Sequence, residues 1–199
     1  MTNKAASRQS LDVALENGSV ATSEADTEPV EANDCLNLYS RELNYLIGTL
    51  RRLGVPRSDI DDVLHEIFLV MLRRFHDYDQ TRPLRPWLAG IAFRVASGQR
   101  RRHGREVPTD ACETEDFGPW PDDLAAATQG RRLLLKALAA VPLKRRAVLI
   151  MHEVDEISMH DIAEQLSIPL FTAYSRLRNA RRELDVALKA LLKDKRHAQ

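Results

Sequence analysis

The chain has 199 residues, of which 44% are hydrophobic, and this is enough to build the core of one medium domain or of two small ones. No run approaches the roughly 18 apolar residues that a membrane helix needs, and the first ten residues lack the apolar core of a signal peptide. The two cysteines stand far apart without a partner at ligand spacing, so neither a disulfide framework nor a zinc site is indicated. We therefore expect a cytoplasmic protein without a metal or other cofactor.

The formal net charge is zero, but the charges are segregated along the chain. Residues 1–34 have a balance of −5, residues 35–105 of +6, residues 106–123 of −7 and residues 124–199 of +6. Two basic blocks separated by an acidic spacer are typical of two nucleic-acid-facing domains on a flexible tether. The plainer interpretation is that alternating charge only keeps a two-domain protein soluble.

The N-terminal half predicts an acidic leader followed by three helices. Residues 1–34 have almost no apolar periodicity, so we expect most of this leader to be disordered. Apolar residues then recur at helical spacing over residues 36–53, 60–75 and 83–102. The third segment ends in Arg100, Arg101 and Arg102, which is more positive charge than the helix dipole requires. These three arginines indicate a phosphate-contacting patch.

Residues 104–123 hold three prolines, two glycines and seven acids without periodicity, and this composition predicts a linker. Two further helices are expected over residues 124–141 and 145–154. Because no strand-like alternation occurs, the fold class we predict is all-α, with two small helical domains joined by a flexible acidic linker. The predicted boundaries are a leader at 1–34, a first domain at 35–103, the linker at 104–123, and a second domain, a helix-turn-helix four-helix unit, at 124–195.

The pattern of residues 157–182 is typical of a DNA-reading helix-turn-helix. Ser158 and Asp161 have capping-box spacing, and Pro169 allows a new helix to open there or at Leu170 and to continue to about Lys193. Leucines and alanines then form one apolar seam, which leaves polar and cationic residues on the other face to contact bases and phosphates. The plainer interpretation is an ordinary amphipathic hairpin with a solvated basic face.

The sequence does not favour an enzyme. The six histidines are scattered, and none lies beside a serine or cysteine in a nucleophile motif. His152-Glu153 lacks the second histidine of a zinc-protease motif. We predict no catalytic residue and no metal site.

Three passages, in order along the chain, resemble the extracytoplasmic-function type of bacterial sigma factor, the compact two-domain branch of the sigma-70 family. They are residues 59–79, residues 82–102 with the signature Pro-Trp-Leu, and residues 141–184. Together they are specific, and the resemblance covers about residues 36–191. It implies a protein that binds core RNA polymerase and directs promoter-specific transcription initiation by reading minus-10 and minus-35 elements.

The resemblance assigns the second helix to docking on the clamp helices of the polymerase largest subunit. Carboxylates there lie beside apolar side chains, a mixed surface suited to a basic partner helix. The assigned residues are Asp61, Asp62, Leu64, His65, Glu66 and Phe68. The acids at this helix start also complement the helix dipole, and both roles can hold together.

The loop His76–Pro83 and the third helix resemble the family's minus-10 reader, in which the loop captures a base flipped out of the non-template strand. Such capture needs flat stacking surfaces, nearby cations and a pocket ready to receive the base. The residues carried over are Asp77, Tyr78, Gln80, Arg85, Trp87, Arg94, Ser97, Gln99, Arg100 and Arg101. Trp87 lies on an apolar seam and is as well interpreted as buried, whereas Tyr78 lies in a polar loop and is expected to be freer to contact a base.

The second helix of the helix-turn-helix resembles the family's minus-35 reader. Its first two turns come closest to base edges, and the later arginines hold phosphates. The residues assigned are Phe171, Thr172, Tyr174, Ser175, Arg176, Arg178, Arg181 and Arg182. Phe171 stands where the family commonly has glycine and Tyr174 where it has lysine or a similar polar residue, so the promoter sequence stays open.

The partners implied are core RNA polymerase, including the flap of its second-largest subunit, promoter DNA and, as a potential regulator, an anti-sigma factor; no membrane insertion is expected. Two rivals remain at this point. A helix-turn-helix regulator without sigma activity would bind duplex operator unaided and give no transcript with core polymerase. An inhibitory helical adaptor would not depend on Arg176 or Arg181.

Overall fold

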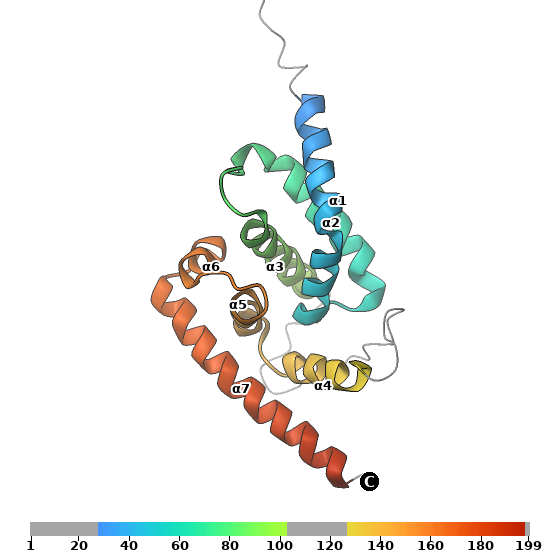
Figure 1. Ribbon diagram of the computed structural model, residues 1–199, viewed down its shortest axis with the longest axis vertical. Coiled ribbons are helices and arrows are strands. Elements are labelled where there is room, and N and C mark those ends of the chain that lie inside the picture. The colour runs from blue at the N-terminus through green and yellow to red at the C-terminus, as the bar shows by residue number, and fades with distance from the viewer. Residues whose placement is uncertain (1–27, 103–126, 198–199) are drawn as a thin grey trace, which may run out of the picture.

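The computed structural model describes residues 28–102 and 127–197, with side chains for residues 33–102 and 129–194. Every regular element in these ranges is helical, which confirms the all-α class (Figure 1). The helices are α1 (Glu28–Leu53), α2 (Ile60–Arg73), α3 (Leu84–Arg102), α4 (Ala127–Ala139), α5 (Leu143–Glu153), α6 (Met159–Gln165) and α7 (Leu170–His197). Short 3-10 turns lie at Arg57–Asp59 and Phe75–Asp77. Most of the predicted leader, residues 1–34, and the whole predicted linker, residues 104–123, lie outside the described residues.

The first three helices form an N-terminal unit around one apolar core. Leu46, Ile67 and Leu88, one from each helix, are fully buried there, and each such side chain contributes about 1.5–3 kcal/mol by leaving water. Helix α1 begins at Glu28, earlier than its apolar periodicity predicted. The additional turns carry Cys35 into the core, where it is fully buried.

Helix α1 ends where the sequence Gly-Val-Pro predicted. The Val55 N–H donates to the Leu50 carbonyl at 3.0 Å and the Gly54 N–H to the Arg51 carbonyl at 3.1 Å, which together make a Schellman C-cap. Gly54 has φ of 80°, a left-handed conformation that glycine adopts without a side-chain clash. The chain can therefore turn sharply into α2.

Helices α4 to α7 form a C-terminal unit with a second core. Val141, Val148, Ile162 and Ala173 are fully buried in it. Helix α7 packs along α5, and its C-terminal half projects beyond the other helices (Figure 1). Helix α7 thus has one end tied to the helix-turn-helix and one face open along most of its length.

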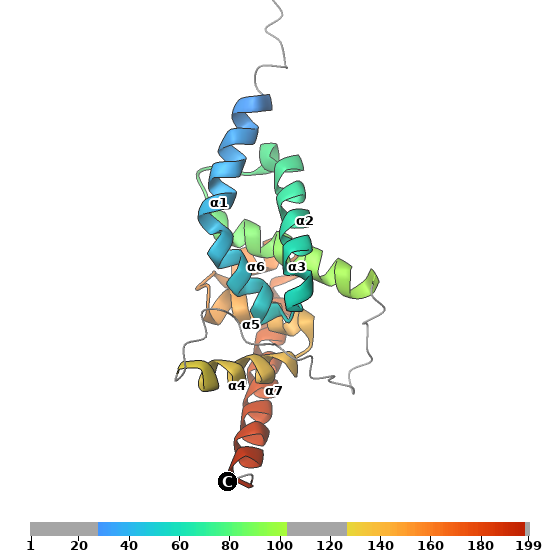
Figure 2. The ribbon, with the colours of Figure 1, turned by 90° about the vertical axis from the view of Figure 1, so that its right-hand side faces the viewer.

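The two units pack directly against each other. Ala147 and Ile150 of α5 belong to the N-terminal core, and Ala89 of α3 belongs to the C-terminal core. Figure 2 shows α5 and α6 lying behind α1 and α3. The boundary between the units is therefore a packed seam formed by α1 and α3 on one side and by α4, α5 and α6 on the other.

A buried arginine crosses this seam. Arg146 is only 3% exposed. Its guanidinium donates to the carbonyls of Ala139 and Val141 in its own unit and, at 2.8 Å, to the Leu53 carbonyl at the end of α1. A buried charge is tolerated when its donors are satisfied in this way, and the acceptors here are helix-terminal carbonyls that need a donor.

Candidate nucleic-acid interface

Ser158 starts the helix-turn-helix by capping α6. Its Oγ accepts a hydrogen bond from the Asp161 N–H at 3.2 Å and donates one to Asp161 Oδ2 at 2.6 Å. The predicted capping pair is therefore formed. Because the acid is short and held by the serine, its other oxygen points outward from the start of α6.

The turn between α6 and α7 repeats the Schellman geometry of the α1 end. The Ile168 N–H donates to the Ala163 carbonyl at 2.9 Å, and the Ser167 N–H donates to the Glu164 carbonyl at 3.0 Å. Ser167 takes the left-handed position with φ of 52°, where glycine is usual. Helix α7 then opens at Leu170, directly after the proline, as predicted.

The outward face of α7 presents two aromatic side chains at its start. Phe171 is 83% exposed and Tyr174 is 54% exposed, while Ala173 and Leu177 on the opposite side are buried. Large apolar side chains this exposed near a helix start are available to a partner. Of the other predicted residues, Arg178 and Arg182 are exposed, and Thr172, Ser175 and Arg176 are half-buried.

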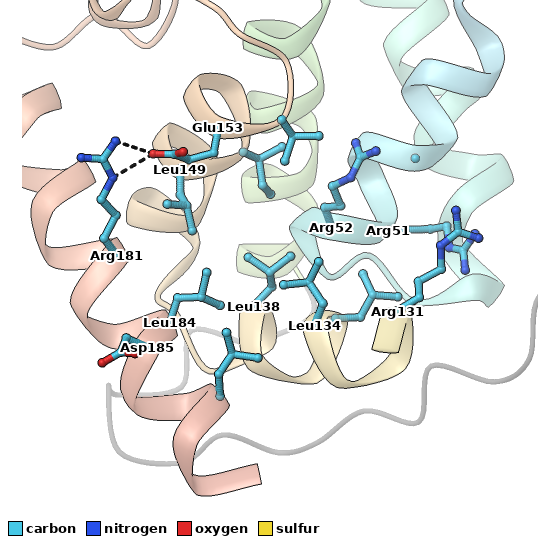
Figure 3. Close-up of a pocket in the computed structure, with 15 residues that line it drawn as sticks. Arg51, Arg52, Arg131, Leu134, Leu138, Leu149, Glu153, Arg181, Leu184 and Asp185 are labelled. Carbon is cyan, nitrogen blue, oxygen red and sulfur yellow. Dashed lines mark hydrogen bonds and ion pairs between the residues drawn. The ribbon is translucent and has the colours of Figure 1, made fainter. Parts of the chain in front are cut away.

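Arg181 does not share this face. Its Nε and Nη2 both donate to Glu153 Oε1 of α5, at 2.8 and 2.5 Å. Figure 3 shows this pair at the wall of a groove of about 610 Å³ between α1, α4, α5 and α7. The prediction that Arg181 holds a phosphate is not supported by this geometry, because the guanidinium is already bound to a carboxylate.

Arg176 is less exposed than its place in the sequence suggested, because its side chain is half-buried on α7. Burial and the neighbouring Arg145 lower the pKa of its guanidinium. Arg145 in turn is paired with Glu183, and Arg182 makes a long 3.4 Å contact with Asn179. Among the arginines predicted to contact the minus-35 element, Arg178 and Arg182 are therefore the most accessible.

The loop before α3 is held more tightly than expected. The Tyr78 ring stacks on Trp87 with 5.0 Å between centroids and an interplanar angle of 25°. Its hydroxyl donates to the Arg82 carbonyl at 2.7 Å, and Trp87 is 9% exposed. Trp87 is thus part of the core, which agrees with the interpretation that it is buried. Tyr78 is half-buried and held by its ring and its hydroxyl, so it is less free to contact a base than its polar loop suggested.

A hollow of about 300 Å³ opens beside this aromatic pair. Its walls come from the loop, from α3 and from α6, and they include Asp77, Tyr78, Trp87, Arg82, Arg94 and Glu164. Asp79 beside it accepts hydrogen bonds from Thr81, which lower the pKa of its carboxyl, and Gln80 is exposed. The lining of the hollow combines aromatic rings and arginines, which suit an unstacked base, with four carboxylates, those of Asp77, Asp79, Asp161 and Glu164.

The remaining predicted residues of α3 divide into paired and open groups. Arg85 bonds to Glu42 at 3.0 Å and lies 5.0 Å over the Tyr45 ring, and Gln99 bonds to Asp59 at 3.2 Å. Ser97 has a buried Oγ without a hydrogen-bond partner among the described residues. Arg100 and Arg101, half-buried and exposed, make no ion pair within the described part of the chain, so they are the cations of α3 most available to a phosphate.

The predicted docking residues of α2 point in two directions. Asp61, Asp62 and His65 are exposed. Leu64 is buried, with its carbonyl accepting from the Tyr39 hydroxyl at 2.8 Å, and Phe68 is half-buried with its ring 5.1 Å from that of Tyr39. These last two residues belong to the core side of α2.

The sequence reasoning missed two leucines on the open side of α2. Leu69 and Leu72 are 38% and 37% exposed, and they follow Asp62 and His65 along one stripe of the helix. Glu66, also on this helix, pairs with Arg102 of α3 at 2.6 Å. The sequence did carry a signal for them, because Leu69 and Leu72 are apolar and yet lie outside the apolar stripe that α2 buries in the core.

No group of metal-ligating side chains occurs among the described residues. Within the same ranges, no helix is long and apolar enough to cross a membrane. The chemistry of this surface is therefore that of arginines, aromatic rings and carboxylates.

Comparison with known proteins identifies the family to which the chain belongs. Residues 38–106 match the family description "Sigma-70 region 2" and residues 131–184 match "Sigma-70, region 4", together more than half of the chain. The chain is 25% identical over 185 residues to the "ECF RNA polymerase sigma-E factor" of Escherichia coli strain K12, covering 86% of this chain and 97% of that protein. The protein of the same name from Haemophilus influenzae is 26% identical over the same length.

Two solved structures share the fold. One is CnrH in complex with the cytosolic domain of CnrY, with a TM-score of 0.54, 21% identity and coverage of 83% of this chain and 99% of that one. The other is the sigma factor RpoE in complex with the anti-sigma factor NepR from Bartonella quintana, with a TM-score of 0.55, 20% identity and coverage of 76% and 96%. The chain thus belongs to the sigma-70 family as an ECF sigma factor, a non-enzymatic protein that directs promoter-specific initiation by RNA polymerase.

Proposed function

We propose that this sigma factor grips its promoter at two points, with α7 on the minus-35 element and α3 with its preceding loop on the minus-10 element. The observation that supports this division most is the exposed face of α7, where Phe171, Tyr174 and Arg178 lie together at three- and four-residue steps. A helix of this kind places its first turns against base edges in the major groove. Phe171 suits contact with a thymine methyl group.

The minus-10 role rests on the α3 side. The hollow beside Tyr78 and Trp87 would receive one base of the melted strand, and Arg100 and Arg101 would hold its phosphates. Asp77, which pairs with Arg74 at 3.3 Å, would mark the rim of that hollow. The pocket is shaped in advance by the stacked rings, so that part of the cost of ordering the base is already met.

The test is run-off transcription with core polymerase on genomic fragments, followed by mapping of the start sites. We expect discrete start sites preceded by a common pair of elements. A regulator without sigma activity would give no transcript with core polymerase alone, and this result would overturn the proposal.

We propose that α2 docks on the polymerase through the stripe formed by Asp62, His65, Leu69 and Leu72. Replacing both leucines in the variant Leu69→Ser/Leu72→Ser removes exposed apolar area that only a partner can bury, so core-polymerase affinity should fall at least about tenfold. The measurement is fluorescence anisotropy of labelled sigma factor titrated with core enzyme.

The matched control is Leu36→Ser/Leu192→Ser, which removes two leucines of similar exposure, 48% and 45%, from α1 and α7. It should leave core affinity unchanged. Equal losses in both double variants would show that the α2 stripe has no special role.

We also propose, from what the two solved relatives are bound to, that an anti-sigma factor holds this protein when it is not in use, and that it acts in the cytoplasm where the polymerase is. Copurification of the tagged chain from its native cell, before and after stress, tests this. Recovery of core polymerase alone under every condition would count against an anti-sigma factor.

A further inference from the structure

The start of α7 carries an exposed apolar patch that lies outside the core. Phe171 is 83% exposed, Tyr174 is 54% exposed and Leu170 is 42% exposed. Residues three and four apart are neighbours on a helix surface, so Tyr174 lies one turn beyond both of the other two. We call these three residues the apolar patch. Grouped apolar side chains on an otherwise polar helix face mark a place where a partner binds.

The apolar patch is held in a fixed position on the C-terminal unit. Ala173 and Leu177, on the opposite side of the same turns, are buried in the core. The Ala173 N–H donates to the Pro169 carbonyl at 3.1 Å, so α7 is regular from its first turn. Ile168, just before the helix, packs against the same core. The rings of the patch therefore extend from a backbone that is anchored both before them and behind them.

Exposed positive charge follows the apolar patch along the same side of α7. Arg178 lies four residues after Tyr174, Arg182 lies four residues after Arg178, and both side chains are exposed. Two aromatic rings are thus followed by two cations in one row. This order favours duplex DNA over a protein partner, because negatively charged phosphates flank the major groove in which base edges are read.

The hydrogen-bonding side chains in the first two turns of α7 are less exposed than the apolar patch. Thr172, Ser175 and Arg176 are half-buried. The side chains that extend farthest are therefore the phenyl ring of Phe171, which has no donor or acceptor, and the phenol ring of Tyr174, which has a single hydroxyl. A phenyl ring cannot read the pattern of donors and acceptors by which most base pairs are told apart.

An apolar side chain can read one feature of the major groove, which is a methyl group. Among the four unmodified bases only thymine presents one there, on C5. The rise from Phe171 to Tyr174 is about 4.5 Å along the helix, and successive base pairs are about 3.4 Å apart. The two rings are therefore spaced to reach adjacent base pairs.

We propose that Phe171 and Tyr174 are specificity-determining residues that read the C5 methyl groups of pyrimidines at two adjacent base pairs of the minus-35 element. In unmodified DNA these pyrimidines are thymines, and 5-methylcytosine presents the same group. The inference rests on the proposed binding of α7 to the minus-35 element and adds which bases its first turns select. Arg178 and Arg182 then fix the position of the helix on the phosphates without selecting sequence.

The first test removes the methyl groups and nothing else. Duplexes are selected from random DNA with the polymerase holoenzyme that contains the full chain and, in parallel, with the full chain alone. Each thymine of the enriched minus-35 element is then replaced by deoxyuridine. At two adjacent base pairs the affinity should fall about fourfold per methyl group, which is the value of burying one such group. An element without thymines at adjacent base pairs, no enriched element in either selection, or no loss with deoxyuridine would overturn the proposal.

The second test assigns each methyl group to its ring. Phe171→Ala should bind the thymine and deoxyuridine duplexes with equal affinity at one base pair, and Tyr174→Ala should do so at the adjacent one. Each variant should keep the fourfold ratio at the other position. Because both duplexes are measured with the same protein sample, any change in folding cancels from the ratio.

The matched control for these variants is Arg178→Ala, which removes a neighbouring exposed side chain from the same row. It should weaken binding to the thymine and deoxyuridine duplexes alike and leave both ratios at about fourfold. Ratios that persist in Phe171→Ala and in Tyr174→Ala would contradict the assignment of the methyl groups to these rings.

The third test separates the methyl group from the rest of the thymine base. A sensitive A·T pair is replaced by a G·C pair, which should weaken binding. Placing 5-methylcytosine at that cytosine should then recover about fourfold in affinity. An absence of recovery would refute the proposal, because the helix would then select the hydrogen-bonding groups or the shape of an A·T pair.

These outcomes are distinguishable from failure of the proposed function. If the chain gives no transcript with core polymerase but its DNA binding still depends on the methyl groups, the proposed function fails and methyl reading stands. If discrete start sites are found and deoxyuridine has no effect, the reverse holds. A Phe171→Ala/Tyr174→Ala variant that binds DNA normally but loses affinity for core polymerase would show that the apolar patch is a protein-binding surface.

Discussion

The two surfaces proposed to face the promoter differ in what they contact in the free protein. On α3 and its loop, Arg82 and Arg94 are bound to α6 and Tyr78 is stacked on Trp87. On α7, by contrast, Phe171 and Arg178 extend into solvent. Two cationic helices of similar composition thus differ within one chain: the arginines of one surface are hydrogen-bonded to α6, and the other surface is exposed to solvent. In the proposed promoter grip, the α7 surface is available in the free protein, whereas the α3 surface is already engaged.

The largest expected effect comes from removing the aromatic floor of the α3 surface. Trp87→Ala deletes a side chain that is 9% exposed, and such a truncation costs about 3–5 kcal/mol in the free energy of unfolding. Urea denaturation followed by circular dichroism measures it. The contrasting variant is Phe171→Ala on α7, which should change unfolding by no more than about 0.5 kcal/mol because the ring is exposed. Similar losses in both would erase the contrast between the surfaces.

A second prediction sharpens the contrast within α7. Arg178→Ala/Arg182→Ala should lower the slope of log affinity against log salt by about 1.8 for duplex minus-35 DNA, since each lost phosphate contact removes about 0.9. Arg181→Ala should leave the slope unchanged, because Glu153 already binds that guanidinium. The measurement is anisotropy with the full-length chain at a series of salt concentrations. A lower slope for Arg181→Ala would restore the phosphate role that the sequence suggested.

The smallest effect concerns the turn that orients the α7 surface. Ser167→Gly relieves a left-handed serine and should stabilise the protein by about 0.5–1 kcal/mol, after allowance for the greater freedom of glycine in the unfolded chain. The urea midpoint should rise at constant slope. Ser40→Gly, in the interior of α1, should instead destabilise by a similar amount. A midpoint lowered by Ser167→Gly would mean that the hydroxyl, not the backbone, decides this position.

The sequence predicted the helices and the helix-turn-helix because both depend on local signals. Apolar periodicity located every described helix, and the Ser158 cap and Pro169 located the ends of the α6–α7 turn. Helix α1 was the exception: it begins at Glu28, within the segment predicted as leader, because its first turns carry little apolar periodicity. Local patterns fix where helices form but not what they touch.

The contacts that distinguish the site could not be predicted in the same way. Arg82 and Asp161 are 79 residues apart in the chain, and the Tyr45–Asp155 pair spans 110. Such pairs follow from the packing of one unit on the other, which no periodicity encodes. The Arg181–Glu153 pair could not be predicted for the same reason, since the position of Arg181 on α7 suggested DNA while the packing of α5 supplies a nearby carboxylate.

Arg146 gives the seam a property that its burial alone would not suggest. Its guanidinium is anchored to the carbonyls of Ala139 and Val141 within its own unit, and one hydrogen bond crosses to the Leu53 carbonyl. If the units part, the arginine keeps its local acceptors and gains water, and the Leu53 carbonyl at the end of α1 is hydrated like any exposed helix end. The seam can therefore open without leaving the Arg146 charge buried and unsatisfied, and it can form again without refolding of either unit.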